Sequence, residues 1–183
     1  MHDSPVGFIG LGNMGGPMAT NLSAKGTALC AFDAAGTQDR APAGSQAVGS
    51  SANVAERCET VFLSLPDGNA VHQVARELAG VENARVRRVI DTSTIGIEAA
   101  RQANDLLSAV DIEYIDAPVS GGRAGAIKAS ISIMCACSTD AYEAVLPLLG
   151  QIAKNPFHVG GEPGMGQAIK VLNNFLSAIA LAD

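Results

Sequence analysis

The sequence predicts an α/β fold in which a doubly wound, mostly parallel sheet is followed by a long terminal helix. Three observations predict it. Short apolar runs alternate with segments of helical periodicity along most of the chain. The first apolar run leads into a glycine-rich turn that opens a helix. The last segment, Met165 to Asp183, is rich in Ala, Leu and Ile and has no Gly or Pro after Gly166. Strands and helices alternating at this spacing favour right-handed crossovers on both faces of a sheet.

The first strand, helix and second strand form one βαβ unit. Val6 to Gly10 is a short apolar run after Pro5, as expected of a strand buried on both faces of a parallel sheet. From Asn13 to Lys25 apolar residues recur every four positions, and Gly26 ends the helix. Leu29 to Phe32 is the second buried strand.

The remaining elements follow a stretch from Ala34 to Ser51 that lacks clear periodicity, which we expect to be a loop or to hold a short helix. The expected helices span residues 53–58, 70–78, 97–109, 141–149 and 165–183. The expected strands span residues 61–65, 89–91, 112–115, 131–136 and 156–159.

Composition limits the classes of function. The 183 residues fit one ordinary domain, and 48% hydrophobic residues with 16% charged residues are typical of a compact protein. A net charge of −6 leaves no basic surface for nucleic acid. We find no secretory leader and no membrane-spanning run, so we expect no membrane partner. Four scattered cysteines favour a reduced, cytoplasmic protein without a structural metal.

The glycine-rich turn is a GxGxxG motif, and its position between a strand and a helix gives it chemical meaning. The first glycine permits a tight turn, the second lets the backbone approach a pyrophosphate, and the third lets the helix pack closely on the strand. The helix N-terminus offers free N–H groups and a positive dipole end to a diphosphate. A turn with only a packing role is the alternative. The candidate cofactor-binding residues here are Gly10, Leu11, Gly12, Asn13, Met14 and Gly15.

Asp33 stands at the carboxyl end of the second strand, 18 residues after Gly15. Its carboxylate can accept hydrogen bonds from the diol of an adenosine ribose, and its charge would repel a 2′-phosphate. The sequence therefore favours NAD over NADP, and the absence of an arginine between Asp33 and Arg40 points the same way. The alternative is an acid that begins a surface turn.

Two further loops follow predicted strands at their carboxyl ends, where open α/β sheets bind ligands. They are SLPDG, residues 64–68, and DTST, residues 91–94, and both are candidate walls of a cofactor crevice. Asp91 and Thr92 are equally well explained as caps of the next helix.

Two segments are candidates for binding a substrate. DAPVSGG, residues 116–122, would expose a hydroxyl and successive backbone N–H groups, which can hold a carboxylate. In GMGQAIKVLNN, residues 164–174, Lys170 and Asn174 lie four apart on one helical face, with Asn173 one step around the helix. These side chains could hold a hydroxyl and move its proton. A plain strand-to-loop turn and a solvated helix face are the alternatives.

Four segments together make the sequence resemble the β-hydroxyacid dehydrogenases, the group of 3-hydroxyisobutyrate dehydrogenase and tartronate semialdehyde reductase. They are GFIGLGNMGGPMATNL (residues 7–22), SLPDG, DAPVSGG and GMGQAIKVLNN, in the family's order. The resemblance implies a Rossmann domain, here residues 1–162, and an inter-domain helix, here residues 163–183. It also implies a helical C-terminal domain that completes the active site, and a full-length protein that forms a homo-oligomer. Family chains are roughly twice the size of a Rossmann domain, so we expect that this helical domain is absent from the sequence.

The resemblance further implies roles for individual residues. Lys170 would be the catalytic acid/base and Asn174 would help to bind substrate. The substrate carboxylate would be received by Ser120, Gly121 and Gly122. The NAD site would be lined by Leu65, Pro66 and Thr94. The implied reaction is hydride transfer between NAD and a short 3-hydroxy acid.

Two other functions stay open at this point: a catalytically incomplete NAD-binding module, and a related 6-phosphogluconate-type or imine-type reductase on the same scaffold. A lysine acts as a base near neutral pH only if desolvation in a closed cleft lowers its pKa. The resemblance implies that the helical domain completes this cleft, and we expect that domain to be absent from the sequence. We therefore expect NAD binding with little or no turnover from this chain alone.

Overall fold

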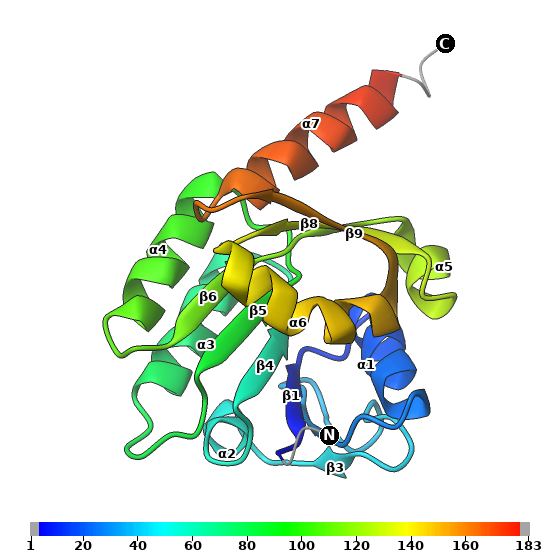
Figure 1. The fold of residues 1–183 in the computed structure, drawn as a ribbon. Helices are drawn as coiled ribbons and strands as arrows, with labels where there is room; N and C mark the ends of the chain where they lie inside the picture. Colours follow the sequence, from blue (N-terminus) through cyan, green and yellow to red (C-terminus); the bar gives the residue numbers. More distant parts are fainter. Residues whose placement is uncertain (1–3, 180–183) are drawn as a thin grey trace.

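A nine-stranded sheet forms the middle layer of the fold, and helices cover both of its faces (Figure 1). The computed structural model describes residues 4–179. The strands are β1 (Val6–Ile9), β2 (Leu29–Phe32), β3 (Gln46–Ala47), β4 (Thr60–Leu63), β5 (Arg88–Asp91), β6 (Glu113–Asp116), β7 (Val119–Ser120), β8 (Ile131–Ala136) and β9 (Ala153–Gly160). The helices are α1 (Gly15–Ala24), α2 (Ser51–Ala55), α3 (Gly68–Ala79), α4 (Ile97–Ser108), α5 (Gly122–Ile127), α6 (Thr139–Ile152) and α7 (Met165–Ile179).

The sheet is mostly parallel, as the sequence predicts. Its order is β3-β2-β1-β4-β5-β6-β8-β7, and β9 pairs with β8. Neighbouring strands from β3 to β6 are parallel. The direction reverses at β8, which is antiparallel to β6 and β7 and parallel to β9.

Two hydrophobic cores form because the central strands are apolar on both faces. In β1, Phe8 belongs to the core under α1 and α6, and the next residue, Ile9, belongs to the core under α2, α3 and α4. Phe62 of β4 stacks on Phe8 with ring centroids 5.6 Å apart. Alternate side chains therefore fill opposite layers, which explains why these strands read as continuous apolar runs.

Most predicted elements are present, and their ends move by a few residues. The structure agrees with the prediction for β8 at both ends, whereas β9 is longer than residues 156–159 and begins at Ala153. The sequence analysis missed β3, β7 and α5, which are two, two and six residues long. The expected end of the last helix, at residues 180–183, lies outside the described residues.

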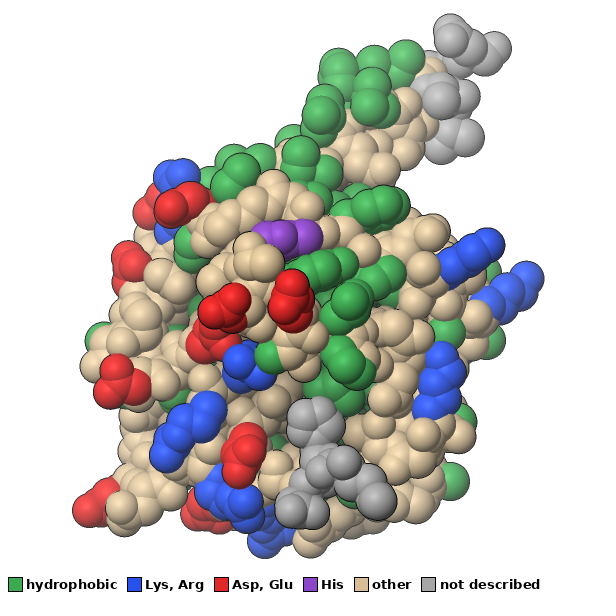
Figure 2. Space-filling view, viewed as in Figure 1, with side chains coloured by type: hydrophobic (Ala, Val, Ile, Leu, Met, Phe, Trp, Pro, Cys, Tyr) green, Lys and Arg blue, Asp and Glu red, His purple; other side chains and the backbone are tan. Residues whose placement is uncertain are grey.

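Helix α7 extends away from the body of the molecule (Figure 1). Its first turn is buried at Gly166 and Gln167, but large apolar side chains farther along are exposed, among them Phe175 with 62% of its surface accessible. Figure 2 shows hydrophobic side chains gathered on this projection. The first turn of α7 is thus buried against the sheet, whereas much of the rest of the helix is exposed.

No helix within residues 4–179 is long and apolar enough to cross a bilayer. The Sγ atoms of Cys135 and Cys137 lie 3.8 Å apart in the buried core, so these two side chains share one face of the chain at the end of β8.

Candidate functional site

A cavity of about 860 Å³ opens where β1, β2, β4 and β5 end. We call it the crevice. It brings together loops that are far apart in the sequence, because the carboxyl ends of parallel strands meet at one edge of the sheet. Predicted site residues that line it are Gly10, Gly12, Asn13, Met14, Gly15, Asp33, Leu65, Pro66, Thr94, Gly122 and Lys170.

The glycine turn forms part of the lining of the crevice. Gly10 has φ +94°, and a Cβ there would collide with the backbone oxygen of Ser64. A Cβ at Gly15 would collide with the oxygen of Gly10, so close packing requires both glycines. Gly12 instead faces open space. Within the described residues, the backbone N–H groups of Gly12, Asn13 and Met14 donate no hydrogen bond, so they are free to bind a ligand.

Asp33 ties the turn to the second strand. Its Oδ2 accepts a hydrogen bond of 2.6 Å from the N–H of Leu11, and its Oδ1 accepts one of 2.8 Å from the N–H of Ala35. The carboxylate also lines the crevice. Arg40 lies closer than the sequence suggested, with its Nε 4.0 Å from Asp33 Oδ1. Asp33 is therefore a structural acceptor for the turn as well as a candidate ribose ligand.

The SLPDG and DTST loops are joined by a hydrogen bond. Ser93 Oγ accepts it from the N–H of Leu65 at 2.9 Å, and Leu65, Pro66 and Thr94 all line the crevice. In the SLPDG loop, Asp67 caps α3 by accepting a hydrogen bond from the N–H of Ala70.

The alternative that Asp91 and Thr92 cap the next helix is wrong. Helix α4 begins at Ile97 and has no side-chain cap. Asp91 is fully buried, where it accepts hydrogen bonds from the N–H of Ser93 and the hydroxyl of Tyr114. Thr92 donates a hydrogen bond to the oxygen of Leu63. Burial raises the pKa of Asp91 to about 6, and the hydrogen bonds that Asp91 makes with Ser93 and Tyr114 oppose that rise.

The first turn of α7 is fastened to the ends of β5 and β6 by buried polar groups. Asp116 Oδ2 accepts hydrogen bonds from the N–H groups of Gly164 and Gln167, so a residue of β6 caps α7. The side chain of Gln167 donates to Asp116 Oδ1 and to the oxygen of Ser93. Its Oε1 accepts from the N–H groups of residues 95 and 96. Burial raises the pKa of Asp116, and these hydrogen bonds oppose that rise.

Lys170 follows Gln167 by one helical turn and lines the crevice. Partial burial lowers its pKa below the ordinary value. Beside it, the side chain of Asn173 donates a hydrogen bond of 3.0 Å to Ser120 Oγ. Asn174 is exposed, and Ser120 and Gly121 do not line the crevice, so of the predicted carboxylate turn only Gly122 lines the same cavity as Lys170.

Sequence reasoning did not single out three residues that organise the site: Gln167, Asp116 and Arg40. The first two occur inside the GMGQAIKVLNN and DAPVSGG segments, so their polar character next to apolar runs was the available signal. Arg40 lies in the loop without periodicity, and only the fold shows its distance from Asp33.

Comparison with known proteins identifies the family. Residues 5–160 match the family model described as the NAD binding domain of 6-phosphogluconate dehydrogenase. The chain is 36% identical over 185 residues to 3-hydroxyisobutyrate dehydrogenase of Pseudomonas aeruginosa. It is 35% identical over 182 residues to 2-(hydroxymethyl)glutarate dehydrogenase of Eubacterium barkeri. Each match covers 97% of this chain and 60% of the relative's length.

Solved structures give the same result. Mycobacterium tuberculosis 3-hydroxyisobutyrate dehydrogenase with L-serine has a TM-score of 0.88 and 34% identity, over 96% of this chain and 60% of that one. Psf3 in complex with NADP+ and 2-OPP has a TM-score of 0.86 and 28% identity, over 97% of this chain and 64% of that one. The chain thus belongs to the family of the NAD binding domain of 6-phosphogluconate dehydrogenase, and its relatives there are 3-hydroxyisobutyrate dehydrogenases and related hydroxyacid dehydrogenases.

Proposed function

We propose that this chain is the NAD-binding part of a dehydrogenase that acts on a short 3-hydroxy acid such as 3-hydroxyisobutyrate. The observation that carries the proposal is a single cavity lined by the glycine turn, by Asp33 and by Lys170. The residues fit a dinucleotide: Gly12 leaves open space beside free N–H groups, and a carboxylate stands at the end of β2.

NAD is the preferred cofactor in this proposal. The carboxylate of Asp33 can accept hydrogen bonds from a ribose diol, and its charge repels a 2′-phosphate. Arg40 at 4.0 Å reduces that repulsion, so the preference is smaller than Asp33 alone would give. The NADP+ bound to Psf3 is consistent with a modest preference, since that chain shares this fold.

Lys170 is the proposed acid/base. When bound in the crevice, NAD would supply the hydride acceptor. Lys170 Nζ would hold the substrate hydroxyl, take its proton during oxidation and return that proton to the carbonyl during reduction. Gly122 and the neighbouring Ser120 and Gly121 would receive the carboxylate, with Ser120 oriented by Asn173. Asn174 is the further predicted substrate ligand.

Turnover should be weak because Lys170 is only partly buried in this chain, so desolvation lowers its pKa less than it would in an enclosed site. The chain spans 54% to 60% of the length of its curated relatives. A site enclosed by further protein would lower the pKa of Lys170 further.

The test is a calorimetric titration with NAD and an assay of 3-hydroxyisobutyrate oxidation, both carried out on the unmodified chain and on the variant Lys170→Met. Lys154→Met, an exposed lysine on β9 outside the crevice, is the matched control. We expect NAD to bind all three proteins and the weak turnover to be lost only in Lys170→Met. Failure to bind NAD would overturn the proposal, and turnover that survives in Lys170→Met would overturn the role of that lysine. Binding without any turnover would favour a non-catalytic module.

A further inference from the structure

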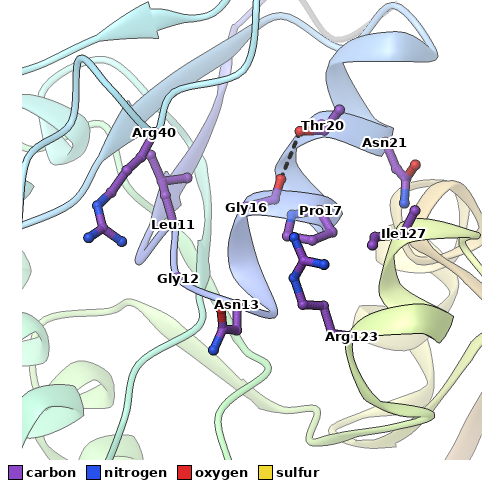
Figure 3. Close-up of a pocket in the computed structure, with 10 residues that line it drawn as sticks. All are labelled: Leu11, Gly12, Asn13, Gly16, Pro17, Thr20, Asn21, Arg40, Arg123 and Ile127. Carbon is purple, nitrogen blue, oxygen red and sulfur yellow. Dashed lines mark hydrogen bonds between the residues drawn. The ribbon is translucent and has the colours of Figure 1, made fainter.

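A second cavity, of about 440 Å³, lies beside the glycine turn and is lined by residues of α1 and α5 (Figure 3). We call it the α1–α5 pocket. It shares Gly12, Asn13 and Arg40 with the crevice, so the two cavities meet at the turn. A ligand that lies over the turn in the crevice is therefore also at the edge of this pocket.

The charged groups in the α1–α5 pocket are both cationic. Arg40 reaches it from the loop after β2, and Arg123 reaches it from the first turn of α5. Figure 3 shows Arg123 pointing toward the first turn of α1, near Pro17. No carboxylate lines the pocket. Arg40 has Asp33 as a partner, whereas Arg123 forms no ion pair within the described part of the chain.

Helix α5 is held in place against α1 by a long-range hydrogen bond. The side chain of Asn21 donates to the backbone oxygen of Ala126 at 2.7 Å, between residues 105 positions apart in the sequence. Ala126 is buried in the core under α1. The backbone that carries Arg123 therefore has a fixed position relative to the turn, and only the arginine side chain has to be ordered when a ligand binds.

We propose that Arg123 binds the diphosphate of the dinucleotide from the α1–α5 pocket, which meets the crevice at the glycine turn. The inference rests on the proposed dinucleotide site. The free N–H groups of Gly12, Asn13 and Met14 supply partial positive charge, but a diphosphate carries two formal negative charges. A guanidinium supplies a formal counter-charge and a planar pair of donors that matches two phosphate oxygens.

The experiment compares ligands with and without a diphosphate. ADP-ribose and adenosine are titrated calorimetrically into the 183-residue chain, Arg123→Gln, Arg123→Lys and the control Lys128→Gln. Lys128 follows α5, is exposed and does not line the pocket, so its substitution removes the same charge from the same region. We expect Arg123→Gln to weaken ADP-ribose binding about tenfold, Arg123→Lys to weaken it less, and adenosine binding to stay unchanged in all variants.

The outcomes separate this inference from the proposed function. Equal ADP-ribose affinity in Arg123→Gln and Lys128→Gln would overturn the role of Arg123 while leaving the dinucleotide site intact. Absence of ADP-ribose binding in the unmodified chain would overturn both. Ribose 5-phosphate is the third ligand, and if Arg123→Gln abolished its binding without changing that of ADP-ribose, the pocket would serve a phosphorylated substrate and the inference would be wrong.

Discussion

Asp33 combines two tasks that are often separate. It fixes the glycine turn by accepting the Leu11 N–H, and it presents negative charge to the crevice within 4.0 Å of Arg40. Removing the whole side chain would disturb the turn and the ligand contact together. A substitution that keeps an acceptor but removes the charge separates the two effects.

We expect Asp33→Asn to lower the ratio of NAD affinity to NADP affinity about tenfold, because the charge-assisted ribose contact and the repulsion of a 2′-phosphate are both lost. Arg40→Gln should raise the same ratio, because it removes the cation near the 2′-position. Calorimetric titration with both dinucleotides measures the ratio, and Arg87→Gln, an exposed residue away from both cavities, is the control. An unchanged ratio in Asp33→Asn would show that Asp33 does not contact the ribose.

Asp91 links stability to pH. Burial raises its pKa from 3.8 to about 6, and the buried groups that face it are Tyr114, Ser93 and Asp116. Between about pH 4 and pH 6 the folded chain holds this proton more tightly than the unfolded chain does. The stabilisation is thus fully present below pH 4 and is lost as the pH rises to 6, by about 3 kcal/mol for a shift of roughly two pKa units.

Asp91→Asn should remove this dependence. The amide oxygen still accepts hydrogen bonds from Ser93 or Tyr114, and no buried charge forms as the pH rises. We expect the free energy of unfolding of the variant, relative to the unmodified chain, to increase from about pH 4 to about pH 6 and to level off above that, as measured by urea unfolding at several pH values. Asp105→Asn, on the exposed face of α4, should give a flat difference, and a flat difference for Asp91→Asn as well would contradict the assignment.

At the scale of elements, predictability followed the length and periodicity of each segment. Strand β8 is a run of apolar residues that ends at a turn on both sides, and the sequence predicts its bounds correctly. Strand β9 lies at an exposed edge of the sheet and contains the polar residues Lys154, Asn155 and His158. These residues interrupt the apolar pattern, so the sequence predicts only half of the strand. Helix α5 has six residues, fewer than two turns, which is too short for a periodic pattern.

The candidate site was predicted where it depends on one local segment and missed where it depends on contacts between segments. The glycine turn, Asp33 and Lys170 could be named because each stands at a recognisable place in a motif. The contacts of Gln167 and Asp116 join residues 51 positions apart, and no local pattern encodes such a pair. Arg123 was not predicted as a ligand for the same reason, because it shares a cavity with Arg40, 83 positions earlier, only in the folded chain.

Gln167 is the element-scale test of how α7 is anchored. Gln167→Ala removes an amide that satisfies buried groups of residues 93, 95, 96 and 116, so we expect a loss of about 3 kcal/mol of stability. Amide hydrogen exchange should become faster at residues 93–96 and 164–170, with smaller changes elsewhere. Gln102→Ala, whose side chain makes an exposed hydrogen bond on α4, is the matched control. Equal effects of the two substitutions would show that the Gln167 network does not hold α7.

At the scale of the whole molecule, α7 presents exposed apolar side chains to solvent. Leu172, Phe175 and Leu176 are each more than half accessible, and contiguous apolar surface of this kind promotes association. We expect the chain to self-associate as its concentration rises, and the double variant Leu172→Ser with Phe175→Ser to reduce that association. Light scattering coupled to size-exclusion chromatography measures it. Val110→Ser, an exposed apolar residue on the body, should have no effect, and persistence of association in the double variant would locate it elsewhere.

The reversal of direction at β8 has a consequence for the crevice. β6 pairs with β8 at Asp116 and Ala136, and β7 continues that pairing at Val119–Ile133 and Ser120–Ser132. Helix α7 is in turn joined to the end of β6 by the hydrogen bonds between Gln167 and Asp116. The position of Lys170 relative to the glycine turn is consequently set by these buried polar contacts at the end of β6.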